Sequence, residues 1–453
     1  MDKRLVILCA IVGIGMMFAS FPDGALSVMV TLVVAIPAMI IIRSHGGEEK
    51  KFLINVFAMA LIARLVLGIA IHTFDLRGIF GPDAFLYDAI GDRQRDIWFG
   101  VTVPEDTLTN RVRNPEASGW GMNYLIGLIY VIFGRSILVA QTFCGVIGAL
   151  TAPLTYFCAK KIFNNKRVAK LSALSVALFP SFVIWSAQLL KDGLLIFLLV
   201  GVMLLLLELQ KKISIQSILL LLVCLFGIFA LRFYLFYMVA VAVVGSFFVG
   251  AGTTVQTVAR NLIIVMVIGL ALTYLGVIRS ATDNLETYGT LERVQVSRQD
   301  LATSADSGFG EEIDVSTPAG AISAVPIGLA YLYLAPFPWQ IGKLSQAFIL
   351  PETMLWWMLL PVLFIGLKFT LKNKFRVALP ILVFSMMLTL LYSVFQGNVG
   401  MLYRQRTQIQ VFLFMFIAVG VTLIQERREN AQMVKEMKNR QLIKELRELK
   451  QKS

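Results

Sequence analysis

Long, uninterrupted apolar stretches recur along the chain and constrain its fold more than any other feature. Most of them approach twenty residues, the length at which an α-helix spans roughly 30 Å of hydrocarbon. They lie near residues 5–21, 25–42, 52–72, 137–159, 168–186, 193–209, 213–231, 234–250, 261–278, 353–371, 377–395 and 408–424. Because the strands of a transmembrane β-barrel alternate apolar and polar residues, continuous runs exclude that fold. We therefore expect an all-α polytopic membrane protein with about twelve transmembrane helices.

The composition supports this class. Hydrophobic residues make up 57% of the 453 residues and charged residues 15%, whereas soluble proteins are nearer 45–50% and about 25%. A soluble enzyme, a disordered chain and a disulfide scaffold are therefore excluded. The net charge of +13 is explained by basic cytoplasmic loops, so we expect membrane lipids and no nucleic acid as partners. The four cysteines lie in or beside apolar runs and are read as core residues.

Short basic segments predict which loops are cytoplasmic. They lie at residues 43–51, 160–167, 211–212 and 372–376. All four fall on the cytoplasmic side if the weaker apolar run 121–133 does not cross the bilayer. Its thirteen residues are too few to span, so we expect an amphipathic helix on the outer surface. Two long hydrophilic segments, 73–120 and 279–325, then face outward.

These boundaries divide the chain into five parts. They are an N-terminal helical hairpin (1–51), a transmembrane module (52–278) with an outer loop (73–136), an outer and interfacial segment (279–352), C-terminal transmembrane helices (353–425) and a basic amphipathic cytoplasmic tail (426–453). The tail is interpreted as a topology anchor or lipid-surface helix, or as a partner-binding coiled coil.

The first outer loop contains the densest group of ionisable residues. Gly81-Pro82 indicates a turn, which places Asp83 at the N-cap position of a following helix and Asp88 more than one turn later. Asp83 is either a capping residue or a carboxylate general base at the membrane face. Tyr87 lies beside both carboxylates in the sequence.

The order of these motifs resembles a known family. The Asp-x-x-x-Tyr pattern of residues 83–87 resembles the first outer loop of polyprenyl-phosphate-sugar-dependent glycosyltransferases of the GT-C fold (family 39, mannosyltransferase-like). Residues 120–136 resemble the family's surface helix with its Phe-Gly turn, residues 141–163 its next span, and residues 169–192 the span that ends in Pro before an acidic residue. The resemblance covers residues 52–230.

The chain departs from the family pattern in two ways. Members usually carry two adjacent acids in the first loop, whereas Ala84 follows Asp83 here, so either Asp83 or Asp88 could be the base. Most members have one span before this loop, whereas three precede it here.

The resemblance implies a membrane glycosyltransferase. It would transfer a sugar, with inversion, from a polyprenyl phosphate to a polysaccharide, lipid or protein acceptor on the outer face of the cytoplasmic membrane. Asp83 or Asp88 would remove the acceptor's hydroxyl proton. Arginines at the outer face would bind the donor phosphate, with Arg404 favoured because glycines lie beside it. The other candidates are Arg406, Arg232, Arg93 and Arg95, together with Arg111 and Arg113.

Four further residues are candidates for contacts with the acceptor or the sugar. They are Tyr87, Asp192, Trp339 and Tyr403. Asp192 could instead be an ion-paired helix end, and Trp339 could belong to an interfacial aromatic belt. We predict no metal ligands and no certain cofactor, although a divalent cation held by the outer carboxylates is compatible with the sequence.

Two other functions remain open from the sequence. An O-antigen-type polymerase or ligase would share the spans, the outer loops and the arginines, and would use a polyprenyl-pyrophosphate glycan. A transporter or flippase is less favoured, because no twofold repeat or pair of broken spans in matching positions is found. No phosphate-binding GxxxxGK[ST] loop is present, so ATP hydrolysis is not supported.

Overall fold

The computed structural model describes residues 2–113, 119–249, 255–303, 307–341 and 344–452. Within these ranges the chain forms helices and no β-sheet, which confirms the all-α polytopic class. The helices are α1 (Lys3–Ala19), α2 (Asp23–His45), η1 (Gly47–Glu49), α3 (Lys50–Thr73), α4 (Arg77–Phe80), α5 (Asp83–Trp98), α6 (Thr107–Arg113), α7 (Trp120–Phe133), α8 (Ile137–Phe163), α9 (Lys166–Leu178), α10 (Pro180–Ser186), α11 (Asp192–Leu209), α12 (Ile215–Leu231), α13 (Phe233–Val249), α14 (Val255–Tyr274), α15 (Val277–Tyr288), α16 (Leu291–Thr303), α17 (Pro318–Leu334), η2 (Pro338–Gln340), α18 (Leu344–Asn373), α19 (Phe375–Phe395) and α20 (Val399–Lys452).

Ten of the twelve expected apolar runs lie within a single helix to within two residues. The run 168–186 is divided between α9 and α10, and the run 261–278 extends from α14 into α15. Among the described residues, eight helices are long and apolar enough to cross a membrane, and the bent pair α9–α10 makes a ninth. The helices α1, α12, α13 and α17 have 17 residues each and would each rise about 26 Å. The total is twelve spans if three of these four helices also cross, and thirteen if all four do.

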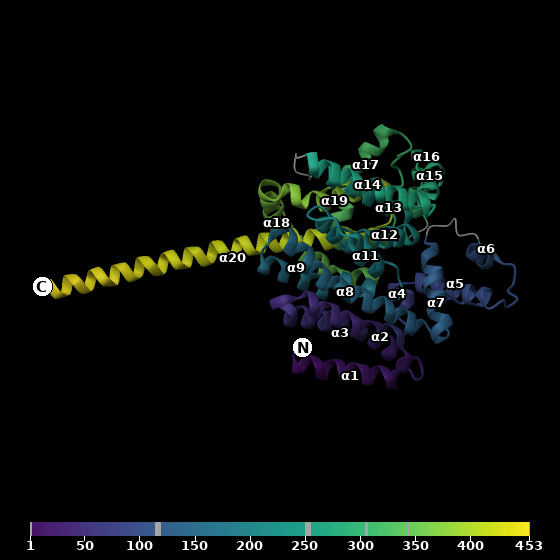
Figure 1. The fold of residues 1–453 in the computed structure, drawn as a ribbon, viewed down its shortest axis with the longest axis horizontal. Coiled ribbons are helices and arrows are strands. Elements are labelled where there is room, and N and C mark those ends of the chain that lie inside the picture. The colour runs from purple at the N-terminus through teal and green to yellow at the C-terminus, as the bar shows by residue number, and fades with distance from the viewer. Residues whose placement is uncertain (1, 114–118, 250–254, 304–306, 342–343, 453) are drawn as a thin grey trace.

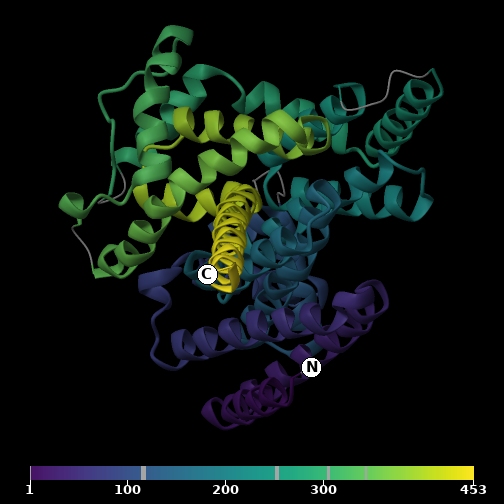
Figure 2. The ribbon, with the colours of Figure 1, turned by 90° about the vertical axis from the view of Figure 1, so that its left-hand side faces the viewer.

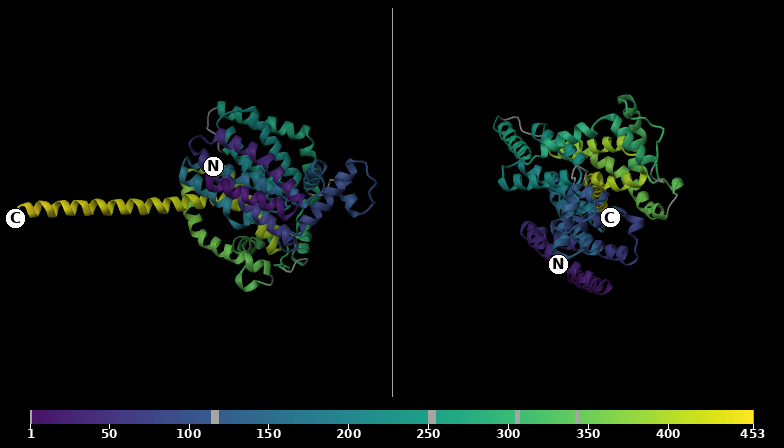
Figure 3. Two further views of the ribbon diagram at one scale, coloured as in Figure 1. Left: turned by 90° about the horizontal axis from the view of Figure 1, so that it is seen from below. Right: turned by 90° about the vertical axis from the view of Figure 1, so that its right-hand side faces the viewer.

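The two long hydrophilic segments lie at one end of the bundle. Figure 1 shows α4–α7, α15 and α16 at this end, whereas the C-terminal part of α20 leaves from the opposite end. The view from below in Figure 3 shows the same separation. We call the first end the loop end. The tail continues α20 as a straight helix away from the bundle, so it does not lie across the bundle end.

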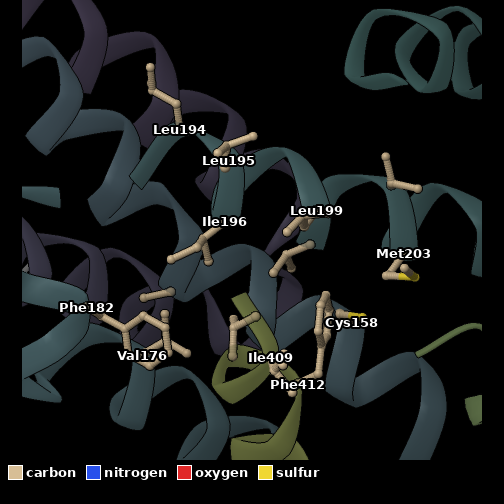
Figure 4. Close-up of a cluster of buried hydrophobic side chains, with 14 of the residues drawn as sticks. Cys158, Val176, Phe182, Leu194, Leu195, Ile196, Leu199, Met203, Ile409 and Phe412 are labelled. Carbon is tan, nitrogen blue, oxygen red and sulfur yellow. The ribbon is translucent and has the colours of Figure 1, made fainter. Parts of the chain in front are cut away.

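The N-terminal and C-terminal halves of the chain meet around α20. Figure 2, which looks along the bundle, shows α1–α3 on one side, α17–α19 on the other and α20 between them. The helix α20 packs against α18 and α9, and α8 packs against α3, α9 and α11. Figure 4 shows part of the resulting core, in which Phe182 of α10 and Leu199 of α11 lie near Ile409 and Phe412 of α20. Close packing of this kind is what holds helices together inside a membrane.

A buried arginine stabilises the one bent span. Pro180 lacks an amide hydrogen and disfavours helical backbone before it, and α9 and α10 meet at 51°. Arg64 of α3 donates to the carbonyls of Ala177 (3.0 Å) and Val176 (3.3 Å) and to Ser186 Oγ (2.7 Å). The guanidinium thereby satisfies the carbonyls that the break leaves unpaired. Arg64 faces the bundle interior, since its exposed fraction is 2%.

Candidate active site

Helix ends bring four charged side chains together at the loop end. Asp83 is the first residue of α5, Asp192 the first of α11, and Arg404 lies in the first turns of α20. Arg232 lies between α12 and α13. An Asp in the first turn is favoured by the partial positive charge of a helix N-terminus. The N-cap of α5 is Pro82, so Asp83 lies one position further into the helix than the sequence predicted.

Arg404 links the two carboxylates. Its Nη1 lies 2.6 Å from Asp83 Oδ2, and its Nε lies 2.5 Å from Asp192 Oδ2. Arg232 Nη2 lies 3.5 Å from Asp192 Oδ1. The Asp192 side chain is fully buried, whereas 48% of the Asp83 side chain is exposed. Asp192 is therefore placed to hold the cations, and Asp83 is accessible to a substrate.

Two guanidinium nitrogens at this site have no hydrogen-bond partner among the described residues. Nη2 of Arg404 and Nη1 of Arg232 are buried and make no hydrogen bond within the described part of the chain. The Trp185 ring lies 5.9 Å from the Arg404 guanidinium and covers it. Buried charged donors without acceptors are costly. These two nitrogens are therefore well suited to bind an oxyanion.

A cavity of about 140 Å³ opens beside Asp83. It is lined by Asp83, Leu86, Tyr87, Ile90, Arg111, Gly119, Trp120, Asn123 and Lys191. Burial raises the pKa of Tyr87 to about 12, so its hydroxyl remains a hydrogen-bond donor at neutral pH. Burial, together with the nearby Arg232, lowers the pKa of Lys191 to about 7. The cavity thus combines a carboxylate, a phenol and an amine that changes charge near neutral pH.

Asp88 lies in a different environment, on the side of α5 that faces α7 and the turn after it. Its carboxylate accepts hydrogen bonds from Tyr130 Oη (2.6 Å) and Arg135 Nη2 (2.7 Å). Arg135 also pairs with Asp92 at 2.7 Å. Asp88 does not line the cavity. Its contacts fasten α5 to α7, and the bond to Asp88 raises the pKa of Arg135.

Arg93 and Arg95 form contacts within the first loop. Arg93 pairs with Asp106 (3.3 Å) and donates to the Pro104 carbonyl (3.2 Å). Arg95 pairs with Asp92 (2.8 Å) and with Asp96 (2.7 Å). These two arginines stabilise the loop and are not brought to Arg404.

Tyr403 and Arg406 lie on either side of Arg404 in the sequence and belong to a second polar cluster, which is buried. Tyr403 donates to Glu352 Oε2 (2.7 Å) and accepts from Ser181 Oγ (2.9 Å), and Ser181 also contacts Glu352. Arg406 lies 5.0 Å from the Tyr403 ring centre and donates to the carbonyl of Ala335 (3.1 Å). This cluster fixes the start of α20, which carries Arg404.

Trp339 lies away from both clusters. It is 75% exposed and its ring stacks on Phe337 at 5.1 Å. An exposed indole of this kind fits an interfacial belt.

Sequence reasoning did not single out Lys191 or Glu352. Lys191 was detectable, because the dipeptide Lys191-Asp192 interrupts an apolar stretch beside a candidate acid. Glu352 gave no signal beyond its position near an aromatic segment. No group of three or more His, Cys, Asp or Glu that could hold a metal ion is found among the described residues.

Fold and site together define a polytopic all-α membrane protein with the GT-C fold. Residues 119–277 match the family described as dolichyl-phosphate-mannose-protein mannosyltransferase. The crystal structure of ArnT from Cupriavidus metallidurans bound to undecaprenyl phosphate is similar to this chain, with 17% identity and a TM-score of 0.50. The match covers 82% of this chain and 60% of that one. No curated protein sequence matches the chain.

These comparisons confirm the resemblance to GT-C glycosyltransferases. The family match begins at α7 and extends to the start of α15, so it overlaps the second half of the stretch recognised in the sequence and continues beyond it. This chain spans about three-fifths of the length of ArnT.

Proposed function

We propose that this protein is a membrane glycosyltransferase that uses a polyprenyl-phosphate-linked sugar as donor. The observation that carries the proposal is the contact between Asp83, which lines a cavity, and Arg404, which lies 2.6 Å from it although the two residues belong to opposite halves of the chain. The similarity to ArnT, whose structure was solved with undecaprenyl phosphate, supports a lipid phosphate as the leaving group.

The cations suit a departing phosphate. Arg404 and Arg232 each have a buried nitrogen that makes no hydrogen bond to the part of the chain that the structure describes, and Lys191 lines the same cavity as Asp83. Hydrogen bonds from ionised donors to a phosphate are short and strong. We assign donor-phosphate binding to these three residues and assign Arg93, Arg95 and Arg406 to structural roles.

The reaction follows from this arrangement. The Asp83 carboxylate takes the proton of the acceptor hydroxyl, and the hydroxyl oxygen attacks the anomeric carbon of the donor sugar. The bond between that carbon and the phosphate oxygen breaks, and the phosphate keeps the electron pair. Attack opposite the leaving group inverts the anomeric centre. Tyr87 lies beside Asp83 as a donor to the sugar or the acceptor.

The loop end is assigned to the outer face of the cytoplasmic membrane. The basic tail of α20 leaves from the opposite end, and basic segments remain cytoplasmic. Donor and acceptor then meet outside the cell, where an acceptor polysaccharide, lipid or protein is available.

A donor panel tests the proposal. Purified protein in lipid nanodiscs is incubated with polyprenyl-phosphate and polyprenyl-pyrophosphate sugars and a glycolipid and glycan extract, and release of the free lipid phosphate is measured by mass spectrometry. We expect turnover of monophosphate donors by the wild type and by Asp96→Asn, but not by Asp83→Asn. Asp96 is a matched control because it lies on the same helix and outside the cavity.

Two results would contradict the proposal. Turnover restricted to pyrophosphate donors would identify a polymerase or ligase, and no turnover of any donor would favour transport. Full activity of Asp83→Asn would remove Asp83 from the reaction.

A further inference from the structure

A second, larger cavity of about 640 Å³ lies at the loop end between α7, α12 and α15. Its volume falls within the range of roughly 300–1,000 Å³ found for small-molecule sites. One wall is aromatic and rigid. The Trp120 ring contacts Tyr124 at 5.5 Å and Phe226 at 5.8 Å, and Phe233 contacts Tyr288 at 5.7 Å.

Another part of the lining is a polar stripe on α15. Ser280, Asp283, Asn284 and Thr287 all line the cavity, and their spacing places them on one face of α15. Asn284 donates to the Ser280 carbonyl and Thr287 to the Asp283 carbonyl, each at 2.8 Å. The amide oxygen of Asn284, the hydroxyls and the carboxylate remain free to accept hydrogen bonds from a ligand.

The charge of this cavity differs from that of the Asp83 cavity. No Lys or Arg of the described chain lines it, and Asp283 contributes a negative charge. A phosphate or another anion is therefore disfavoured here. Aromatic faces opposite hydroxyl, amide and carboxylate groups suit an uncharged sugar, whose C–H faces pack on rings while its hydroxyls donate and accept hydrogen bonds.

The two cavities adjoin each other. Gly119 and Trp120 line both of them, so a ligand in the larger cavity can extend toward Asp83. Gly119 has a φ of +97° and lies close to Lys191. A residue without a side chain therefore forms the backbone between the two cavities.

We infer that the larger cavity binds an uncharged oligosaccharide, namely the glycan portion of the acceptor, and presents its terminal hydroxyl to Asp83. The inference rests on the proposed function for the direction of transfer, but the binding of a neutral glycan can be tested without it. It narrows the acceptor from a polysaccharide, lipid or protein to a molecule that carries a neutral saccharide chain.

Matched threonines on α15 provide the test. Thr287 and Thr282 both donate to the carbonyl four residues earlier, at 2.8 and 3.0 Å, but Thr287 lines the cavity and Thr282 does not. Thr287→Val removes a hydroxyl from the cavity, and Tyr288→Ala removes part of the aromatic wall. Thr282→Val is the control for helix stability.

Binding is measured first, with no donor present. Uncharged gluco-, manno- and galacto-tetrasaccharides are added to the full chain in nanodiscs, and saturation-transfer NMR records contact with the protein. We expect at least one tetrasaccharide to bind to the wild type and to Thr282→Val. The loss of one hydrogen bond in Thr287→Val should weaken binding roughly threefold to tenfold, and Tyr288→Ala should weaken it by at least as much.

Kinetics with that sugar then separate this inference from the proposed function. We expect Thr287→Val to raise the KM for the acceptor by a similar factor and to leave the KM for the donor unchanged. If transfer occurs but both KM values match the wild type, the inference is wrong and the proposed function stands. If no tetrasaccharide binds, or if Tyr288→Ala instead reduces binding of undecaprenyl phosphate, the cavity is not a glycan site.

Discussion

Asp192 and Arg404 form an ion pair of 2.5 Å although 212 positions separate them in the chain. The pair joins the start of α11 to the start of α20, and the Asp192 side chain is fully buried. Asp192 also lies 3.5 Å from Arg232. One buried carboxylate thus positions both guanidinium groups that we assign to the donor phosphate.

Removal of this carboxylate should destabilise the protein. Asp192→Ala removes the carboxylate that pairs with buried Arg232 and leaves Arg404 with Asp83 alone, and breaking such a buried pair costs about 3–5 kcal/mol. We expect a lower free energy of unfolding, measured by denaturant titration in micelles with tryptophan fluorescence. Asp96→Ala, which disrupts a partly exposed pair with Arg95, should cost less than about 1 kcal/mol. Equal losses in the two variants would show that the Asp192 pair is not structural.

Asp83→Asn should affect turnover and not folding. Asp83 is half-exposed, and Arg404 keeps its pair with Asp192. A positioned general base contributes roughly 100-fold to 10,000-fold in rate, so we expect kcat to fall by at least 100-fold while the unfolding midpoint stays unchanged. A matching drop in the midpoint would point to a structural role.

Asp88→Asn should show the opposite pattern. Its carboxylate binds Arg135 and Tyr130 away from the cavity, and loss of a charged partner costs about 1–3 kcal/mol. We expect a lower unfolding midpoint, with kcat per folded molecule within about threefold of the wild type. A kcat loss as large as that of Asp83→Asn would make Asp88 the stronger candidate for the base.

Donor binding should weaken as pH rises through neutrality. Burial and Arg232 lower the pKa of Lys191 to about 7, so the amine is charged below that pH and neutral above it. A polyprenyl-phosphate sugar is a phosphodiester whose charge does not change in this range. We expect the KM for the donor to rise between pH 6 and pH 8 in the wild type and to stay flat in Lys191→Arg, which remains charged. The same slope in both proteins would exclude Lys191 as the titrating group.

Cysteine labelling tests the assigned orientation. Phe99 follows α5 at the loop end and is 62% exposed. We expect Phe99→Cys to react with a membrane-impermeant maleimide in intact cells, with wild-type protein as the control for the native cysteines. Labelling only after the cells are opened would place Asp83 on the cytoplasmic side.

The sequence alone determined the fold class and the positions of the helices. Runs of apolar residues must form helices in a bilayer, because unpaired backbone groups are too costly there. Each of the twelve expected runs lies, to within two residues, in one helix or in two consecutive helices. Local signals were also sufficient for the start of α5 to within one residue, whereas the break at Pro180 within the run 168–186 was not predicted from them.

Only the tertiary structure decided which candidate residues share a site and which belong to other clusters. Asp83 and Asp88 are five positions apart on one helix, yet Asp83 meets Arg404 and Asp88 meets Arg135. Arg404 and Arg406 are two positions apart and point into different clusters, because successive residues on a helix face different directions. The partners of these residues lie tens to hundreds of positions away, and helix packing decides such contacts, which local sequence patterns do not encode.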